Sequence, residues 1–283
     1  MPEALVRGVH INYEIVGDNG PMIALTPGSR RAYGELLPLA GRLAKGGYRM
    51  LLHDRRNCGA SDVAFDDSGS EHDIWADDLH ALCGQLGALP VFVGGSSAGA
   101  RLALLFALRH PQATRGLLLW RVTGGKHAVD RLAQNYYGQF IEIARTGGMQ
   151  AVCGSEHFAA CIAARPSNRE RLMQTDPARF IKVMQTWREH FLQSATLPIV
   201  GATEAQLRAL SMPVCLIAGN DVIHTPVTAR RMASLVPGSE LHDDVVEKRA
   251  DDNLLHDWNQ QEWKQAEGRI AEIFAGFLKR KAG

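Results

Sequence analysis

The stretch of sequence that decides the fold is VFVGGSSAG, residues 91–99. Its first four residues predict a buried strand, and residues 98–110 have the apolar spacing of a helix. Between strand and helix, Gly95 and Gly99 bracket Ser97 in the pattern G-x-S-x-G. A side chain in such a strained turn needs glycine two residues before and after it, because a Cβ there would collide with the neighbouring strand and helix. We therefore predict that Ser97 lies at the N-terminal end of a helix, whose amides and dipole favour negative charge developing nearby.

Outward from this turn, short apolar runs alternate with longer stretches of helical period. The expected strands are residues 22–26, 48–53, 91–94, 116–120, 214–219 and 240–246, and the expected helices are 33–45, 74–86, 98–110, 226–235 and 261–278. Residues 4–16 alternate as in a hairpin, which predicts an antiparallel edge. The pattern predicts an α/β fold with a mostly parallel, doubly wound sheet that is covered by helices on both faces.

This alternation stops in the middle of the chain. Residues 128–145, 169–174 and 177–193 have helical patterns, and no strand pattern accompanies them. We therefore predict a core made of residues 1–121 and 211–283 and a helical cap, or lid, at residues 122–210. A cap over the carboxyl edge of a sheet is where a small-molecule pocket lies.

Composition excludes several classes of function. The 283 residues carry 31 basic and 30 acidic side chains, with no run of like charge long enough to neutralise a row of phosphates, so nucleic acid is not expected as a partner. No apolar stretch approaches the roughly 20 residues of a membrane helix. Because Met1-Pro2-Glu3 is not followed by a basic segment and an apolar run, we expect no signal peptide. The five cysteines are odd in number and form no CxxC pair, which indicates reduced thiols rather than disulfides or a zinc site. We expect a cytoplasmic protein with a small-molecule substrate, no membrane contact, no metal and no cofactor.

A serine nucleophile needs a histidine base, and that histidine needs a carboxylate. Asp221 follows the strand 214–219 and is the predicted acid, although an aspartate before a helix also serves as a cap or turn residue. Three histidines follow it: His224, His242 and His256. We predict that His256 is the base, because a side chain in the loop before the closing helix can fold back over the carboxyl edge of the sheet. His224 is so close to Asp221 that we expect it to brace the loop, and His242 falls within the last predicted strand.

Backbone donors must also stabilise the oxyanion of a tetrahedral intermediate. The N–H of Ala98 is one donor by its position after the nucleophile. The second is expected from the loop TPGSRR, residues 26–31, where Gly28 lets the backbone approach and the N–H of Ser29 donates. A simple proline-glycine turn is the alternative interpretation of this loop.

Taken together, these residues resemble the α/β-hydrolase superfamily, over nearly the whole chain apart from the cap. Besides the turn at Ser97, the segment HDRRNCGASD, residues 53–62, resembles the D-x-R-G-x-G-x-S-D loop of capped esterases, lactonases, haloperoxidase-like enzymes and C–C hydrolases. The segment VPGS, residues 236–239, resembles the family's turn before its last strand. The resemblance implies a nucleophile, an acid and a base at Ser97, Asp221 and His256, and an oxyanion hole at Ser29 and Ala98.

The sequence also departs from the family pattern. Pro27-Gly28 replaces the usual His-Gly of the oxyanion loop, and Asn57 replaces a glycine. Thr225 stands where proline commonly follows the acid, and Leu255-His256 replaces the usual Gly-His after a longer, charged loop. Serine rather than aspartate at the turn argues against epoxide hydrolase and haloalkane dehalogenase mechanisms, which need a carboxylate nucleophile.

Aromatic side chains of the cap predict a partly apolar pocket, unless they merely hold the cap to the core. The predicted pocket residues are Arg30, Trp120, Tyr137 and Trp187, and the arginines that could bind a substrate carboxylate are Arg30, Arg31, Arg101 and Arg121. The predicted function is hydrolysis of a carboxylic ester or lactone through an acyl-enzyme on Ser97. Two alternatives stay open: hydrolysis of a C–C bond in a vinylogous diketone acid, and a ligand-binding receptor or inactive scaffold, which the altered loop around His256 suggests.

Overall fold

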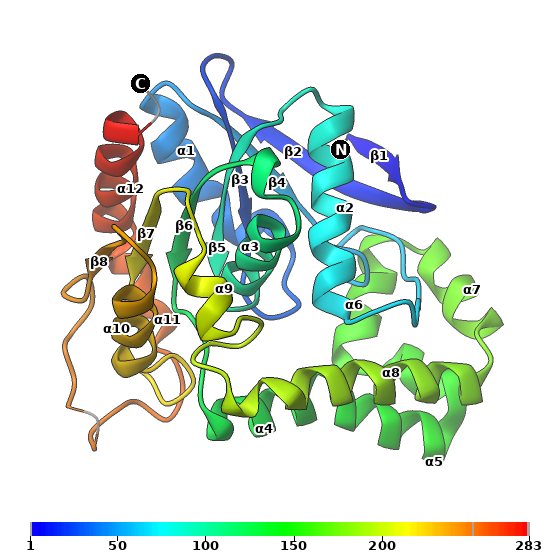
Figure 1. Ribbon diagram of the computed structural model, residues 1–283. Coiled ribbons are helices and arrows are strands. Elements are labelled where there is room, and N and C mark those ends of the chain that lie inside the picture. The colour runs from blue at the N-terminus through cyan, green and yellow to red at the C-terminus, as the bar shows by residue number, and fades with distance from the viewer. Residues whose placement is uncertain (1, 251, 282–283) are drawn as a thin grey trace.

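A single sheet forms the centre of the computed structural model, which describes residues 2–250 and 252–281 (Figure 1). The strands are β1 Glu3–Val6, β2 Val9–Val16, β3 Met22–Thr26, β4 Arg49–His53, β5 Val91–Ser96, β6 Thr114–Trp120, β7 Val214–Ile217 and β8 Glu240–His242. Their order across the sheet is β1-β2-β4-β3-β5-β6-β7-β8. The pairs from β4 to β8 are parallel, whereas β2 pairs antiparallel with both β1 and β4. The predicted mostly parallel sheet with an antiparallel edge is confirmed.

Helices cover both faces of this sheet. Helices α1 (Leu37–Lys45) and α12 (Glu267–Lys281) lie on one face, and α2 (Glu71–Gln85), α3 (Ala98–Arg109) and α10 (Pro226–Leu235) lie on the other. The alternation of strand side chains produces these two cores. In β3, Ala24 packs with the core under α2 and α3, whereas Ile23 and Leu25 pack with the core under α1 and α12. Burial on both faces explains why the strands are apolar almost throughout, as the doubly wound prediction requires.

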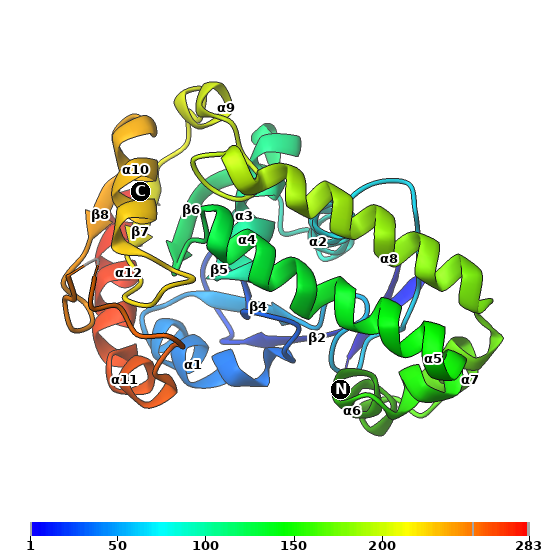
Figure 2. The same ribbon diagram turned by 90° about the horizontal axis from the view of Figure 1, so that it is seen from below.

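A set of helices lies between β6 and β7, and we refer to residues 122–210 as the cap. They are α4 Lys126–Ala133, the π turn η3 Gln134–Gly138, α5 Gln139–Gly154, α6 Glu156–Ala164, α7 Ser167–Gln174, α8 Pro177–Leu192, the turn η4 Gln193–Thr196 and α9 Glu204–Arg208. Figure 2 shows α4, α5 and α8 crossing the edge of the sheet at which β6 ends. Apolar side chains of the cap form a cluster of their own, in which Phe158 and Phe180 are fully buried. The division into a core domain and a cap domain stays a prediction.

The last strand is shorter than its apolar pattern predicts, because β8 ends at His242. The chain then forms a charged loop, in which Asp243 pairs with Arg230 and Lys248, both at 3.1 Å. This loop returns to the sheet at Leu255, whose carbonyl oxygen accepts a hydrogen bond from the N–H of Val222 at 2.9 Å. The return brings the residues after Leu255 to the edge of the sheet where β5 and β7 end.

The remaining helices are short: η1 Tyr33–Leu36, η2 Pro111–Ala113 and α11 Gln260–Gln265. Within residues 2–250 and 252–281, no helix has both the length and the apolar character to cross a bilayer. All five cysteines are buried as free thiols.

Candidate active site

Ser97 occupies a sharp turn between β5 and α3. Its backbone has φ 54° and ψ −110°, a left-handed conformation that costs energy for any residue but glycine. A Cβ on Gly95 would lie 2.6 Å from the carbonyl oxygen of Thr26, and one on Gly99 would lie 2.1 Å from it. Both glycines are therefore required for the close approach of the turn to β3. Ser97 is buried, and its hydroxyl lies at the N-terminal end of α3, where the sequence pattern places it.

The side chain that contacts this hydroxyl is His224. Its Nε2 lies 2.8 Å from Ser97 Oγ, and its Nδ1 lies 2.9 Å from each carboxylate oxygen of Asp221. A carboxylate only accepts hydrogen bonds, so Nδ1 carries the proton and Nε2 is left to accept one from the serine hydroxyl. The three side chains form the serine, histidine and carboxylate array of an activated nucleophile.

The local sequence explains how His224 reaches this position. Asp221 Oδ1 accepts hydrogen bonds from the N–H groups of Ile223 and His224, both at 2.9 Å, which closes a tight turn after β7. Gly219 lies against this turn, and a Cβ on it would lie 2.2 Å from the His224 carbonyl oxygen. Thr225 then caps α10, which begins at Pro226. His224 is therefore held between the turn at Asp221 and the start of α10.

Arg121 adds a positive charge to the array. Its NH2 lies 3.1 Å from Nδ1 of His224 and 3.5 Å from a carboxylate oxygen of Asp221. Burial lowers the pKa of His224, the charge of Arg121 lowers it further, and Asp221 only partly opposes them, which leaves a pKa of about 4. Burial raises the pKa of Asp221, but the hydrogen bond from His224 and the charges around it outweigh burial and bring the pKa to about 2. At neutral pH the array therefore holds a neutral imidazole and an ionised carboxylate.

The structure corrects the predicted base, because His256 does not reach Ser97. The His256 side chain is exposed, and its carbonyl oxygen accepts a hydrogen bond from Arg131 of α4 at 3.0 Å. Arg131 also pairs with Asp257. The loop does fold back over the carboxyl edge of the sheet, as expected, but it presents Trp258 to the site instead of the histidine.

Two cations lie against the ring of Trp258. The guanidinium carbons of Arg31 and Arg121 lie 4.3 and 4.2 Å from the centre of its rings, so both side chains stack on the indole. Arg31 is paired with Glu35 at 2.6 Å. The indole therefore connects the oxyanion loop, the end of β6 and the loop before α11.

The expected oxyanion donors belong to the loop after β3 and to the start of α3. Ser29 has φ 46° and lines the same cavity as Ser97, and Ala98 is the first residue of α3. A Cβ on Gly28 would lie 3.5 Å from Ser97 Cβ, which shows how closely this loop approaches the turn. In the described part of the chain, neither the Ser29 N–H nor the Ala98 N–H has an acceptor. Both donors are thus free for an oxyanion.

A cavity of about 320 Å³ opens at Ser97. It is lined by Ser29, Arg31, Ser97, Arg121, Arg131, Leu132, Asn135, Tyr136, Asp221, Ile223, His224, Asp257 and Trp258. The sequence pattern gave no sign that Arg131, Asn135 and Trp258 belong there, since they come from α4, the π turn and the loop before α11.

The four predicted pocket residues lie elsewhere. Arg30 is buried and forms two 2.7 Å hydrogen bonds with the carboxylate of Glu71, which also accepts one from the Tyr137 hydroxyl at 3.2 Å. Trp120 packs on Phe274 of α12, with ring centres 5.5 Å apart. Trp187 donates to the Asp66 carbonyl oxygen at 3.0 Å and lines a second cavity between cap and core. The structure therefore corrects this group: its members support the cap or the sheet, and none lines the Ser97 cavity.

The described residues contain no group of three or more His, Cys, Asp or Glu side chains that could hold a metal ion.

The framework of a mostly parallel sheet with a serine in the strand-turn-helix after β5 defines this protein as an α/β hydrolase. Within that class the chain belongs to the family described as serine aminopeptidase, S33, which matches residues 18–248. The hydrolase YraK of Bacillus subtilis is 33% identical over 107 residues, which cover 38% of this chain and 39% of that protein.

Two further proteins match over most of their length. A proline iminopeptidase of Lactiplantibacillus plantarum is 25% identical over 253 residues, which cover 82% of this chain and 87% of that protein. Among solved structures, the enol-lactonase from Burkholderia xenovorans LB400 superposes with a TM-score of 0.62 and 18% identity, over 96% of this chain and 99% of that one. This structural likeness concerns the fold alone.

Proposed function

We propose that the protein cleaves a carboxylic ester or lactone of a small, partly apolar substrate through an acyl-enzyme on Ser97. The observation that carries this proposal is the 2.8 Å contact between Ser97 Oγ and His224 Nε2, with Asp221 behind the imidazole. Nε2 is positioned to take the hydroxyl proton while Oγ attacks the carbonyl carbon.

The departure of the alcohol and the hydrolysis of the acyl-enzyme use the same groups. The imidazolium of His224 gives its proton to the departing alcohol oxygen, which leaves Ser97 acylated. Water then loses a proton to His224 as it attacks the acyl carbon, and Ser97 recovers its proton when the acid leaves. During both steps the free N–H groups of Ser29 and Ala98 are suited to bind the oxyanion.

Trp258, Leu132, Ile223 and Tyr136 give part of the cavity an apolar wall, which suits a small apolar acyl or alcohol group. A receptor or inactive scaffold is less well supported than an enzyme. The sequence feature that suggested it was the altered loop around His256. With His224 in contact with Ser97, the array does not depend on that loop for a base.

The relatives suggest a second candidate, the removal of an N-terminal residue from a peptide. Such an activity needs a carboxylate to bind the substrate ammonium group. The two carboxylates of the Ser97 cavity are engaged, Asp221 with His224 and Asp257 with Arg131. Arg31, Arg121 and Arg131 add positive charge to the same wall, so an ester or lactone fits the cavity better than an amino-terminal peptide.

The proposal is tested by intact-mass analysis after incubation with a fluorophosphonate. Wild type is expected to gain one adduct, Ser97→Ala none, and His224→Gln one that forms much more slowly. His256→Gln is the matched control and is expected to react at the wild-type rate. Absence of an adduct in folded wild-type protein, together with no hydrolysis of 4-nitrophenyl acetate, would overturn the proposal.

A further inference from the structure

Arg101 lies one helical turn after Ser97 on α3, and its N–H donates to the Ser97 carbonyl oxygen at 3.0 Å. Its side chain is only 4% exposed. The guanidinium carbon lies 4.5 Å from the ring centre of Phe191, near the end of α8. The cation is thus buried at the contact between the core and the cap.

The hydrogen bonds of this guanidinium are incomplete. NH1 lies 2.8 Å from Nε2 of His72, which must be the unprotonated nitrogen of a neutral imidazole to accept the bond. Burial lowers the pKa of His72 well below its usual value, and the charge of Arg101 lowers it further. Nε and NH2 of Arg101 have no partner among the residues that the structure describes.

No carboxylate forms an ion pair with Arg101 within residues 2–250 and 252–281. Glu71 is next to His72 in the chain, but its two carboxylate oxygens accept from Arg30 at 2.7 Å each. A buried charge without a counter-ion is costly, and proteins normally pair it. An anion that is absent from the polypeptide itself would remove this cost.

Arg101 also lines a cavity of about 320 Å³ between the cap and the core. His72, Trp187, Phe191, Ser194 and Val200 are among the residues that line it with Arg101. The cavity has the size of a small-molecule site and combines aromatic walls with the guanidinium of Arg101.

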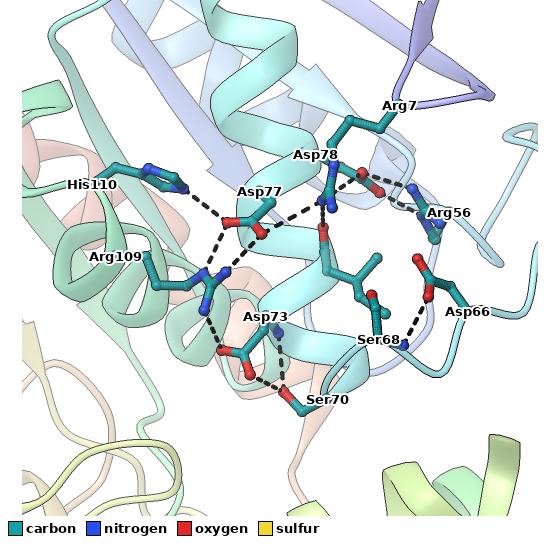
Figure 3. Close-up of polar contacts among 11 residues, drawn as sticks. Arg7, Arg56, Asp66, Ser68, Ser70, Asp73, Asp77, Asp78, Arg109 and His110 are labelled. Carbon is teal, nitrogen blue, oxygen red and sulfur yellow. Dashed lines mark hydrogen bonds and ion pairs between the residues drawn. The ribbon is translucent and has the colours of Figure 1, made fainter.

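The two free atoms lie on the same edge of the guanidinium. Nε and NH2 donate in parallel, so they match the two oxygens of one carboxylate. Figure 3 shows this edge in use twice in the same molecule: Arg56 holds Asp78 through Nε and NH2 at 2.6 and 2.8 Å, and Arg109 holds Asp77 at 2.8 and 2.7 Å. At Arg101 the same two nitrogens have no hydrogen-bond partner among the residues that the structure describes.

We infer that Arg101 binds a carboxylate group of the substrate. The ester or lactone that is hydrolysed therefore carries a free carboxylate in addition to the bond that is cleaved. This inference rests on the proposed function, because it assigns the substrate class of the site at Ser97. The other arginines considered for this role are engaged: Arg30 with Glu71, Arg31 with Glu35 and Arg121 with Asp221. After burial and Arg121, the charge of Arg101 also contributes to the low pKa of His224, so Arg101 lies within electrostatic range of the base.

Binding of sodium benzoate tests the inference without any turnover. Isothermal titration calorimetry of the full chain is expected to show saturable binding of benzoate and at least about tenfold weaker binding of benzamide, which has the same shape but no charge. Arg101→Gln is expected to weaken benzoate binding by about tenfold or more, and Arg101→Lys to weaken it less. Ser97→Ala and Arg188→Gln, an exposed change on α8, are expected to bind benzoate as wild type does.

Hydrolysis of two matched esters gives a second readout. Wild type is expected to prefer 4-nitrophenyl hemiglutarate to 4-nitrophenyl pentanoate by about tenfold or more in kcat/KM. Arg101→Gln is expected to remove this preference, chiefly by raising KM for the hemiglutarate. Circular dichroism shows whether each variant folds, and Arg101→Lys replaces Arg101→Gln if the latter does not.

The two proposals fail in different ways. If neither ester nor the fluorophosphonate reacts, the proposed function is wrong, but benzoate binding that depends on Arg101 would still support the anion site. If folded wild type shows no saturable binding of benzoate up to its solubility limit, or if Arg101→Gln binds it as tightly as wild type, the inference is overturned.

Discussion

Asp221 and His224 lie three residues apart in a single turn, with both carboxylate oxygens of Asp221 2.9 Å from Nδ1 of His224. The acid and the imidazole are therefore both supplied by the loop after β7. The loop after β8 therefore does not have to supply the base, and it contributes Trp258 to the wall of the cavity. The site is thus built from two turns, at Ser97 and at Asp221, that follow strands separated only by β6.

The two histidines at this edge are expected to differ sharply in their effect on hydrolysis. His224→Gln removes the group that contacts Ser97 Oγ, so kcat/KM for 4-nitrophenyl acetate should fall by about 10³ or more. His256→Gln changes an exposed side chain and should leave kcat/KM within about twofold. Steady-state assays of the purified variants check this, and a large loss in His256→Gln with none in His224→Gln would contradict the assignment.

Much of the fold could be predicted from the sequence, because fully buried strands leave an unmistakable apolar run. The strand predicted at residues 22–26 matches β3 at both ends. The turn at Ser97 was equally readable, since Gly95 and Gly99 have no room for a Cβ. Helices α6 and α9 were missed, because short helices repeat their apolar pattern too few times.

The identity of the base was harder to predict because one turn has two roles. Asp221 does brace its loop, through the N–H groups of Ile223 and His224, as a capping aspartate would. The same turn also directs the imidazole of His224 toward Ser97. The local sequence does not show whether such a histidine only braces its loop or also contacts the serine. The prediction of the pocket residues failed for a different reason. Whether Arg30 or Arg101 lacks a carboxylate partner depends on Glu71, which is 41 residues from Arg30 in the chain.

Gly219→Ala is expected to misplace the base although none of the three triad residues is replaced. The new Cβ would lie 2.5 Å from Cβ of His224, so the turn must shift. Since displacements of about 1 Å in an active site can cost about 10²-fold in rate, kcat should fall by a factor of about 10 to 100. Gly268→Ala is the matched control, because a Cβ there meets nothing within 4 Å and the residue lies in α12. Equal activity of the two variants would contradict the role of Gly219.

The free energy of unfolding is expected to decrease as the pH falls below about 6.5. Burial and the charge of Arg55 lower the pKa of His53 to about 3. Burial and the charges of Arg30 and Arg55 lower the pKa of His157 to about 3 as well. In this pH range the unfolded chain binds protons at these histidines and the folded chain does not, so acidification favours unfolding. Each histidine should cost about 2 kcal/mol between about pH 7.5 and about pH 5.

Urea titrations at the two pH values measure this loss. His157→Gln removes one of the titrating groups and should reduce the difference between the two unfolding free energies. His127→Gln, which changes an exposed residue, should leave the difference as it is in wild type. A wild-type stability that is the same at both pH values would contradict the prediction.

Activity is expected to persist to a lower pH than an unperturbed histidine would allow. The base must be neutral to accept a proton, and the pKa of His224 is about 4, so kcat/KM should be level near neutral pH and fall to half near pH 4. Arg121→Met removes a cation that lies 3.1 Å from Nδ1, and the pKa must then rise toward the ordinary histidine value. The midpoint of the acid limb of the pH profile should therefore move to higher pH in this variant, while His256→Gln keeps the wild-type profile.

Asp221 still fixes the imidazole through Nδ1 in Arg121→Met. The activity of this variant near neutral pH should therefore change little, although the midpoint of its acid limb moves. Profiles of kcat/KM for 4-nitrophenyl acetate, with circular dichroism at each pH to confirm folding, distinguish this outcome from a wild-type midpoint near 6.5, which would show that Arg121 and burial do not set the pKa of the base.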